Sequence, residues 1–256
     1  MGQTTAWPVD ARRDRLVGDW HIYQRTGGHR TSTDDLIAAW YAVHRSASTP
    51  ARYLDLGCGI GSVLLMVTHK VRPPVARGVE AQAQSVMMAR RAVSELPSHQ
   101  SEIEVHHADF RDLIENDGLY DLITGSPPYF PTGTGVLPAD AQRRACRFEE
   151  RGGVEAYAGA AARLMTTSGR FYVVFQTRGS ARVMAAAHAH GLHLGGRADF
   201  HARAQDVAPF LTVFEFSRTP SQPLHRFACA VRDVDGAVSF SYERIRRELG
   251  VSATPR

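Results

Sequence analysis

The chain has 256 residues, of which 43 % are hydrophobic and 22 % are charged, enough for one large domain with a substantial core. No apolar run approaches the roughly 20 residues needed to cross a bilayer. The net charge of +4 is carried almost entirely by arginine, which suits a polyanionic partner without requiring one. The three cysteines, Cys58, Cys146 and Cys229, have no disulfide or metal spacing. We therefore expect a cytoplasmic protein with neither a membrane anchor nor a metal site.

The first fifty residues, 1–50, are expected to form an N-terminal extension. Within it, residues 18–41 are typical of a hairpin that leads into a helix. Ser32 or Thr33 is suited to cap that helix, and the two aspartates that follow are favourable in its first turn.

From about Arg52 onward, apolar strands alternate with helical segments. This alternation predicts a single doubly wound, mostly parallel α/β sheet within residues 51–218, with helices on both faces. The last two strands have no helix between them, so we expect an antiparallel hairpin at one edge. The expected strands are 51–58, 76–80, 102–110, 119–125, 170–176, 193–201 and 210–218, and the expected helices are 62–70, 81–96, 154–169 and 179–191.

The C-terminal segment, residues 219–256, contains two further strand-like stretches, 225–233 and 237–245. Asp235-Gly236 between them is a turn-forming dipeptide. We expect a C-terminal strand pair and tail packed on the same domain.

A glycine-rich turn follows the first strand of the sheet, in "LDLGCGIGS". Ligands of open parallel sheets bind beyond the carboxyl ends of the strands. Closely spaced glycines let the chain turn sharply and let a ligand approach, and the next helix points its N-terminus there. The spacing Gly57-x-Gly59-x-Gly61 differs from the dinucleotide fingerprint G-x-G-x-x-G. A simple tight turn is the alternative reading.

Acidic residues end the next two strands. Glu80 ends the second strand, where a carboxylate accepts hydrogen bonds from both hydroxyls of a ribose. Asp109 ends the third. Either acid alone is explained equally well by a cap or a turn. Together with Asp55 they follow successive strands in register, which favours a bound adenosine.

"SPPY" follows the fourth strand, as Ser126 to Tyr129. Two consecutive prolines lack N–H groups and fix φ, so they end the strand and stiffen the loop. An isolated "PPY" is as often a solvent-exposed polyproline ligand. Its position after this series of strands favours a ligand-binding role.

These motifs resemble those of class I S-adenosylmethionine-dependent methyltransferases, in which the glycine loop lies under the methionine part of the cofactor. "SPPY" resembles their amino-group variant, which methylates exocyclic nitrogens of adenine or cytosine, or a side-chain amide. The resemblance implies S-adenosyl-L-methionine as cofactor. The residues expected to bind it are Asp55, Gly57, Cys58, Gly59, Gly61, Glu80, Asp109 (toward the adenine amino group), Phe110 and Ser126.

The chemistry of such an amine explains the motif. Its lone pair is delocalised, so it is a poor nucleophile until acceptors take both N–H groups and direct the lone pair at the methyl group. Ser126 Oγ and the Pro127 carbonyl offer two acceptors, and Tyr129 offers a face for stacking a base. We expect positioning by a rigid, polar site to supply most of the rate. The expected catalytic group is Ser126, Pro127, Pro128 and Tyr129.

The N-terminal segment "IYQRTGGHRTSTDDLIAAWY", together with "GSPPYFPTGTG", is similar to bacterial tRNA adenine-N6 methyltransferases that modify position 37 of a valine tRNA. Thr31 replaces an aromatic residue usual there, and Ser126 replaces an asparagine. The resemblance implies a tRNA substrate. The matching N-terminal positions are Gln24, Arg25, Arg30, Ser32 and Asp34.

Four residues are candidates for substrate binding: Phe130, Arg30, Arg143 and Arg178. The arginines suit contacts with phosphates, although Arg143 lies in a stretch that also fits a solvated helix face.

Three other functions stay open. One is a protein glutamine N-methyltransferase, although the short segment before Arg52 lacks room for its usual helical domain. Another is a DNA amino-methyltransferase, although no sizeable target-recognition domain is evident. The third is a non-catalytic methyltransferase-like scaffold, against which the intact motifs argue.

Overall fold

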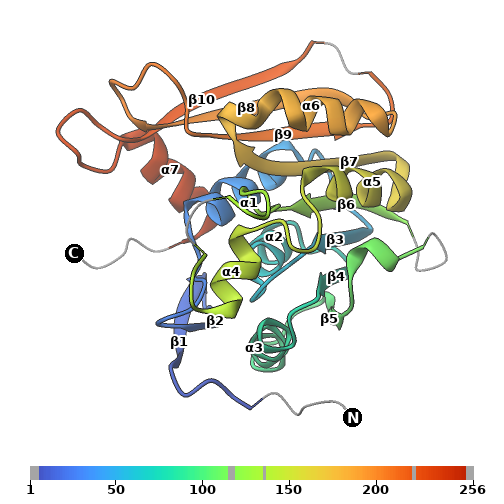
Figure 1. Ribbon diagram of the computed structural model, residues 1–256, viewed down its shortest axis with the longest axis vertical. Coiled ribbons are helices and arrows are strands. Elements are labelled where there is room, and N and C mark those ends of the chain that lie inside the picture. The colour runs from blue at the N-terminus through green and yellow to red at the C-terminus, as the bar shows by residue number, and fades with distance from the viewer. Residues whose placement is uncertain (1–5, 115–118, 135–136, 221–222, 252–256) are drawn as a thin grey trace.

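The computed structural model describes residues 6–114, 119–134, 137–220 and 223–251, and a twisted eight-stranded sheet lies at its centre (Figure 1). The strands lie in the spatial order β10 (His225–Arg232), β8 (His193–Arg203), β9 (Leu211–Ser217), β7 (Met165–Gln176), β6 (Tyr120–Gly125), β3 (Arg52–Leu56), β4 (Val75–Glu80) and β5 (Glu102–His107).

The five strands from β7 to β5 are parallel, whereas β9 runs antiparallel to both β7 and β8. The predicted mostly parallel α/β sheet with an antiparallel hairpin is confirmed. The hairpin does not form the edge, however, because β10 pairs in parallel with β8 beyond it. The C-terminal segment therefore extends the same sheet.

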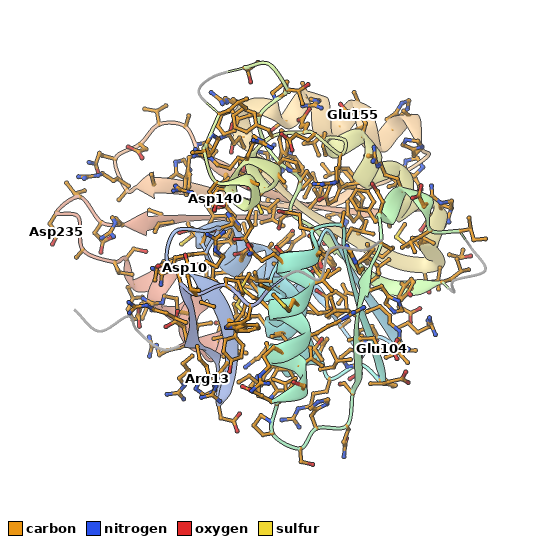
Figure 2. The ribbon with its side chains drawn as sticks, turned by 60° about the horizontal axis from the view of Figure 1, so that its bottom comes forward. Asp10, Arg13, Glu104, Asp140, Glu155 and Asp235 are labelled. Carbon is orange, nitrogen blue, oxygen red and sulfur yellow. The ribbon has the colours of Figure 1, made fainter. Side chains whose placement is uncertain are left out.

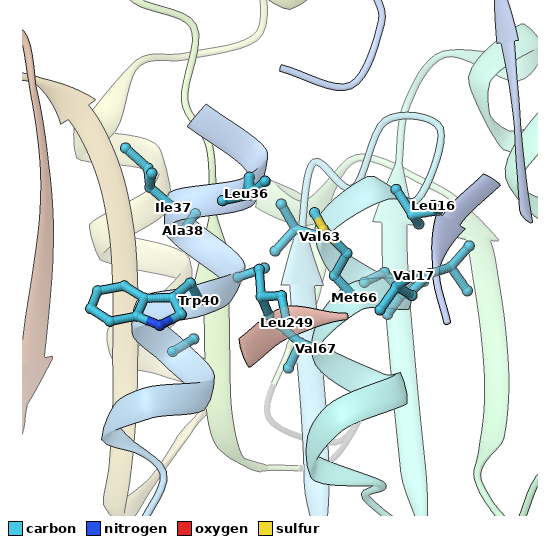
Figure 3. Close-up of a cluster of buried hydrophobic side chains, with 14 of the residues drawn as sticks. Leu16, Val17, Leu36, Ile37, Ala38, Trp40, Val63, Met66, Val67 and Leu249 are labelled. Atoms are coloured by element: carbon cyan, nitrogen blue, oxygen red, sulfur yellow. The ribbon is translucent and has the colours of Figure 1, made fainter. Parts of the chain in front are cut away.

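Helices cover both faces of the sheet. One face carries α1 (Thr33–Arg45), α2 (Ser62–Val71), α3 (Ala83–Ser94) and α7 (Phe240–Leu249), and the other carries α5 (Val154–Leu164) and α6 (Ser180–Ala189). Figure 3 shows part of the hydrophobic core on the face that carries α1, α2, α3 and α7. There, Leu249 of α7 lies beside apolar side chains of α1 and α2. Within the described part of the chain, no helix combines the length and apolar character needed to span a membrane.

The N-terminal extension begins with a hairpin of β1 (Ala11–Val17) and β2 (Trp20–Arg25), which precedes α1 as predicted. Ser32 is the N-cap of α1, and its backbone N–H donates to Asp35 Oδ2 at 3.0 Å. Helix α1 packs directly against β6, β7 and β9, so the extension shares the core of the sheet. The predicted boundaries at residues 51 and 219 stay a prediction.

Two predicted elements were wrong. The helix expected over 154–169 ends at Leu164, because β7 begins at Met165, where Met165 pairs with Tyr120. The strand expected over 237–245 is mostly helix α7, so the expected pairing across Asp235-Gly236 is limited to one antiparallel bridge, between Arg232 and Val238. Ser239 caps this helix by accepting from the Tyr242 backbone N–H, and the face that it buries repeats at helical spacing, with Tyr242, Ile245 and Leu249.

A buried carboxylate ties α1 to the sheet. Glu215 on β9 is 3 % exposed, accepts from Arg45 Nε at 2.6 Å and lies 3.5 Å from Arg170 Nε. Glu215→Gln is expected to lower the free energy of unfolding by about 2 kcal/mol, since a buried charge-assisted hydrogen bond is weakened. Urea denaturation measures this. Glu104→Gln, which affects a half-exposed ion pair with Arg77, is the control and is expected to cost less than about 0.5 kcal/mol. Equal losses in both variants would contradict the role of Glu215.

Candidate active site

The carboxyl ends of β3, β4, β5 and β6 open into one cavity of about 850 Å³, a volume that includes space open to solvent. Gly61 lies behind it as the N-cap of α2. The other eight residues predicted to bind a cofactor line this first cavity: Asp55, Gly57, Cys58, Gly59, Glu80, Asp109, Phe110 and Ser126.

The glycine turn needs glycine at each of its three positions. Gly57, Gly59 and Gly61 have φ values of +62°, +56° and +90°, in the left-handed region. A Cβ added to Gly57 would lie 2.3 Å from Tyr157 Oη, whereas one at Gly59 would meet nothing within 4 Å. The backbone at Gly59 is therefore open to a ligand in the first cavity.

Glu80 links the end of β4 to this turn. Its Oε2 accepts from the Gly59 backbone N–H at 3.0 Å, and its Oε1 accepts from the Gln82 N–H at 2.6 Å. Burial raises the pKa of Glu80, and these two N–H groups oppose that shift. Each carboxylate oxygen has a second lone pair, so both oxygens keep acceptor capacity for ligand hydroxyls.

Asp55 is buried below the turn. Its Oδ1 accepts from Thr124 Oγ1 at 2.6 Å, while Oδ2 has no hydrogen-bond partner among the described residues. Burial raises the pKa of Asp55 to about 7. A buried acceptor without a partner is uncommon in proteins and is often explained by a ligand.

Asp109 lies at the cavity but is already engaged. Arg111 donates to it through Nε at 2.9 Å and Nη2 at 2.6 Å, and this pairing lowers the pKa of Asp109. The predicted contact with an adenine amino group stays a prediction. Phe110, whose ring centroid lies 4.4 Å from that of Tyr157, offers an aromatic surface at the same end.

The "SPPY" loop separates the first cavity from a second one. Ser126 and Pro128 line the first cavity, whereas Ser126, Pro127 and Tyr129 line the second, of about 1330 Å³ including space open to solvent. Tyr129 is held at both ends. Its Oη donates to Asp34 Oδ2 at 2.5 Å, and its ring packs edge-on against Phe175 at 5.3 Å between centroids.

Four residues line both cavities and so form the boundary between them: His29, Asp35, Ser126 and Cys146. Only Ser126 was predicted as a site residue. Asp35 had a partial signal, since it stands in the first turn of a helix whose Ser32 and Asp34 match the resemblance. No sequence motif pointed to His29 or Cys146 as site residues.

Helix α4 (Ala141–Arg147) and the loop after it cover the two cavities. Arg25 fastens the start of the helix, with Nη1 donating to Asp140 Oδ2 at 2.7 Å and Nε to Asp10 Oδ1 at 2.8 Å. Asp10 and Asp140, the two carboxylates that Arg25 joins, are labelled in Figure 2. Arg25 thus has a structural role. Arg151, in the loop that follows, belongs to the same basic stretch as Arg143 and lines the first cavity.

The predicted substrate-binding residues divide into two groups. Phe130, Arg30 and Arg143 line the second cavity, together with Arg147 from the same basic stretch as Arg143. Arg178 does not line either cavity but lies next to the second one, because it donates to Oε1 of Gln176 at 2.9 Å and Gln176 lines that cavity. It stands in the short 3₁₀ turn at 177–179 that follows β7.

Comparisons with known proteins agree with this site. The methyltransferase small domain family matches residues 40–143, which include the glycine turn, Glu80, Asp109 and the "SPPY" loop. A "tRNA1(Val) (adenine(37)-N6)-methyltransferase" from Yersinia pestis is 28 % identical over 221 residues, covering 84 % of this chain and 79 % of that protein. The chain is an S-adenosylmethionine-dependent methyltransferase.

Further relatives of this methyltransferase agree. A protein of the same name from Yersinia pseudotuberculosis is also 28 % identical, over 84 % of this chain and 77 % of its own length. The crystal structure of a predicted O-methyltransferase from Agrobacterium tumefaciens superposes with a TM-score of 0.59 at 19 % identity, covering 84 % of this chain and 98 % of that one. This last likeness shows the fold.

The first cavity of the methyltransferase fits its cofactor. Glu80 offers acceptors for ribose hydroxyls, Asp55 Oδ2 offers a buried acceptor for an ammonium group, and the open backbone at Gly59 allows close approach. Among the described residues, no group of three histidines, cysteines or acids could hold a metal ion.

Proposed function

We propose that this methyltransferase modifies N6 of an adenine in tRNA. The observation that carries the proposal is the position of Ser126 to Tyr129 between two cavities. One has the acidic and glycine-rich lining suited to S-adenosylmethionine, and the other has exposed arginines at its rim. The Yersinia relatives, which carry that activity in their names, support the same substrate. Such a substrate also favours a cytoplasmic location.

The first cavity would hold the cofactor. Glu80 would accept its ribose hydroxyls, Phe110 would pack on its adenine, and Asp55 would receive its ammonium group through the partnerless Oδ2. When bound, S-adenosylmethionine supplies an electrophilic methyl group on a positively charged sulfur. These side chains fix where that methyl group lies relative to Ser126.

The target adenine enters the second cavity. Ser126 Oγ and the Pro127 carbonyl accept its two N–H bonds, and the Tyr129 ring stacks on the base. The two prolines hold the acceptors, while Asp34 and Phe175 hold the tyrosine. A site arranged before the substrate arrives pays little reorganisation energy, so positioning supplies most of the rate.

The rim of the second cavity suits phosphates that flank the target base. Arg30, Arg143 and Arg147 line it, and Arg143 and Arg147 are exposed. Phosphate contacts fix the position of the nucleic acid, and an adenine must leave its stack to reach the cavity.

Arg143→Ala is therefore expected to weaken tRNA binding several-fold and to lower the slope of log K against log salt by about one. Fluorescence anisotropy at several salt concentrations measures both quantities. Arg91→Ala removes an exposed arginine in the last turn of α3 that lines neither cavity, so it is the matched control and should leave both quantities unchanged. Equal effects from the two variants would contradict the assignment of the rim.

Transfer of labelled methyl groups tests the proposed function. The protein is incubated with labelled S-adenosylmethionine and, in turn, total tRNA, rRNA, DNA and a release factor, and the products are digested and separated. We expect label in N6-methyladenosine from tRNA. Label only in glutamine, or only in N4-methylcytosine, would contradict the proposal, and cofactor binding without any transfer would indicate a scaffold.

A further inference from the structure

A methyl group that passes from the cofactor to the target amine must cross the boundary between the two cavities. The residues that line both cavities are His29, Asp35, Ser126 and Cys146. Asp35 is the single carboxylate among these four. No motif marked it as a site residue, yet it lines the same two cavities as Ser126, the serine that should hold the amine.

The fold fixes the position of this carboxylate. Asp35 is the third residue of α1 and is only 9 % exposed. Its Oδ2 accepts from the Ser32 backbone N–H at 3.0 Å, and this capping bond does not use Oδ1. Ser32 thus fixes the carboxylate through its backbone N–H, and its side chain also interacts with Asp35, while the residue lines both cavities.

The amine needs a group that can remove a proton. Methylation leaves the nitrogen with a positive charge and one proton too many. Ser126 Oγ and the Pro127 carbonyl accept hydrogen bonds but are far too weak as bases to keep the proton. A carboxylate at the same boundary is able to keep it.

We propose that Asp35 accepts the proton that the target amine releases on methylation, an inference that rests on the proposed function. The nitrogen lone pair forms the bond to the methyl carbon as the carbon–sulfur bond breaks and its electrons stay on sulfur. An N–H bond then breaks, its electrons remain on nitrogen, and the proton moves to Asp35. The resulting carboxyl group returns the proton to water before the next turnover.

The charges around Asp35 suit this role. Burial raises its pKa to about 7, the nearby charge of Asp34 adds to the shift, and the Ser32 N–H opposes it. Asp55 from β3, Cys146 from α4 and Tyr129 face the same region. A group with a pKa near the working pH takes up and returns a proton readily.

His29 is the competing proton acceptor at the boundary. Burial lowers the pKa of its imidazole, and the nearby cations Arg143 and Arg147 lower it further, while Asp34 opposes them. The imidazole therefore holds a proton less well than an ordinary histidine. This favours Asp35 over His29.

Asp35→Asn is the decisive variant, because asparagine keeps an oxygen to accept from the Ser32 N–H and loses the ability to bind a proton. We expect kcat for tRNA methylation to fall at least about tenfold. This lies below the usual 10²–10⁴ of general base catalysis, because the amine is not deprotonated before attack. KM for tRNA, the cofactor Kd and Tm should stay near wild-type values.

The pH profile separates this role from a structural one. Since protonated Asp35 cannot accept, wild-type kcat at saturating cofactor should fall as the pH drops through about 7, and Asp35→Asn should lose that dependence. Protonation of Asp55, whose pKa is also about 7, should instead weaken cofactor binding. Asp121→Asn is the matched control. Asp121 also accepts backbone N–H groups, from Ala51 and Arg52, at the opposite end of the sheet, and its variant should keep wild-type kcat.

Two results would overturn the role of Asp35. One is equal kcat in wild type and Asp35→Asn. The other is a pH dependence that persists in Asp35→Asn and disappears in His29→Gln. A wild-type protein that methylates no tRNA would instead contradict the proposed function, and this inference with it.

Discussion

Glu80→Ala is expected to raise the dissociation constant for S-adenosylmethionine by about 10²-fold. The substitution removes the acceptors for two ribose hydroxyls, and a hydrogen bond to a charged group contributes about 1.5–3 kcal/mol. It also frees the Gly59 and Gln82 N–H groups that Glu80 holds at 3.0 and 2.6 Å, so the glycine turn loses its anchor to β4. Isothermal titration with S-adenosylmethionine or its demethylated product measures the change.

Glu104→Ala is the control for Glu80. Glu104 lies on the neighbouring strand β5 (Figure 2). It is about half exposed and lines neither cavity. Its loss should leave cofactor affinity within about twofold of wild type. Unchanged affinity in Glu80→Ala would show that the cofactor does not use the end of β4.

Tyr129→Ala should leave cofactor binding nearly unchanged and slow methyl transfer to tRNA. Stacking on an aromatic ring contributes about 1–3 kcal/mol per base, so kcat/KM for tRNA is expected to fall by about 5- to 150-fold. Cofactor affinity should change by less than about twofold, because Tyr129 lines only the second cavity. Single-turnover transfer and cofactor titration on the same preparation give the two quantities.

Tyr129→Phe separates the ring from the hydroxyl. It keeps the packing against Phe175 and loses the 2.5 Å hydrogen bond to Asp34. Most of the transfer activity should survive in this variant. If Tyr129→Ala itself transfers methyl groups at the wild-type rate, the stacking role is wrong.

The parts of the site that could be predicted are those whose conformation depends on a few consecutive residues. A strand followed by Gly57-x-Gly59 forms the same turn wherever it occurs, because only glycine accepts those φ values. An acid that ends a parallel strand lies at the ligand edge by topology alone. The sequence alone therefore places Glu80 and Ser126 at the ligand-binding edge of the sheet.

The parts that could not be predicted depend on contacts between distant segments. Cys146 reaches the site because Gln142 of α4 donates to Ser85 Oγ of α3 at 3.0 Å, a docking that no local pattern records. His29 reaches it through the turn between β2 and α1. The first residues of helix α7 alternate in polarity, which is typical of a strand, and its helical face becomes clear only further along.

The most direct test of the site is a crystal structure of the protein with S-adenosylhomocysteine and adenosine. We predict the cofactor ribose on Glu80 and its sulfur facing the boundary, with the adenosine amino nitrogen between Ser126 and Asp35. A cofactor bound elsewhere, or an adenosine whose amino group points away from Ser126, would contradict the two-cavity arrangement.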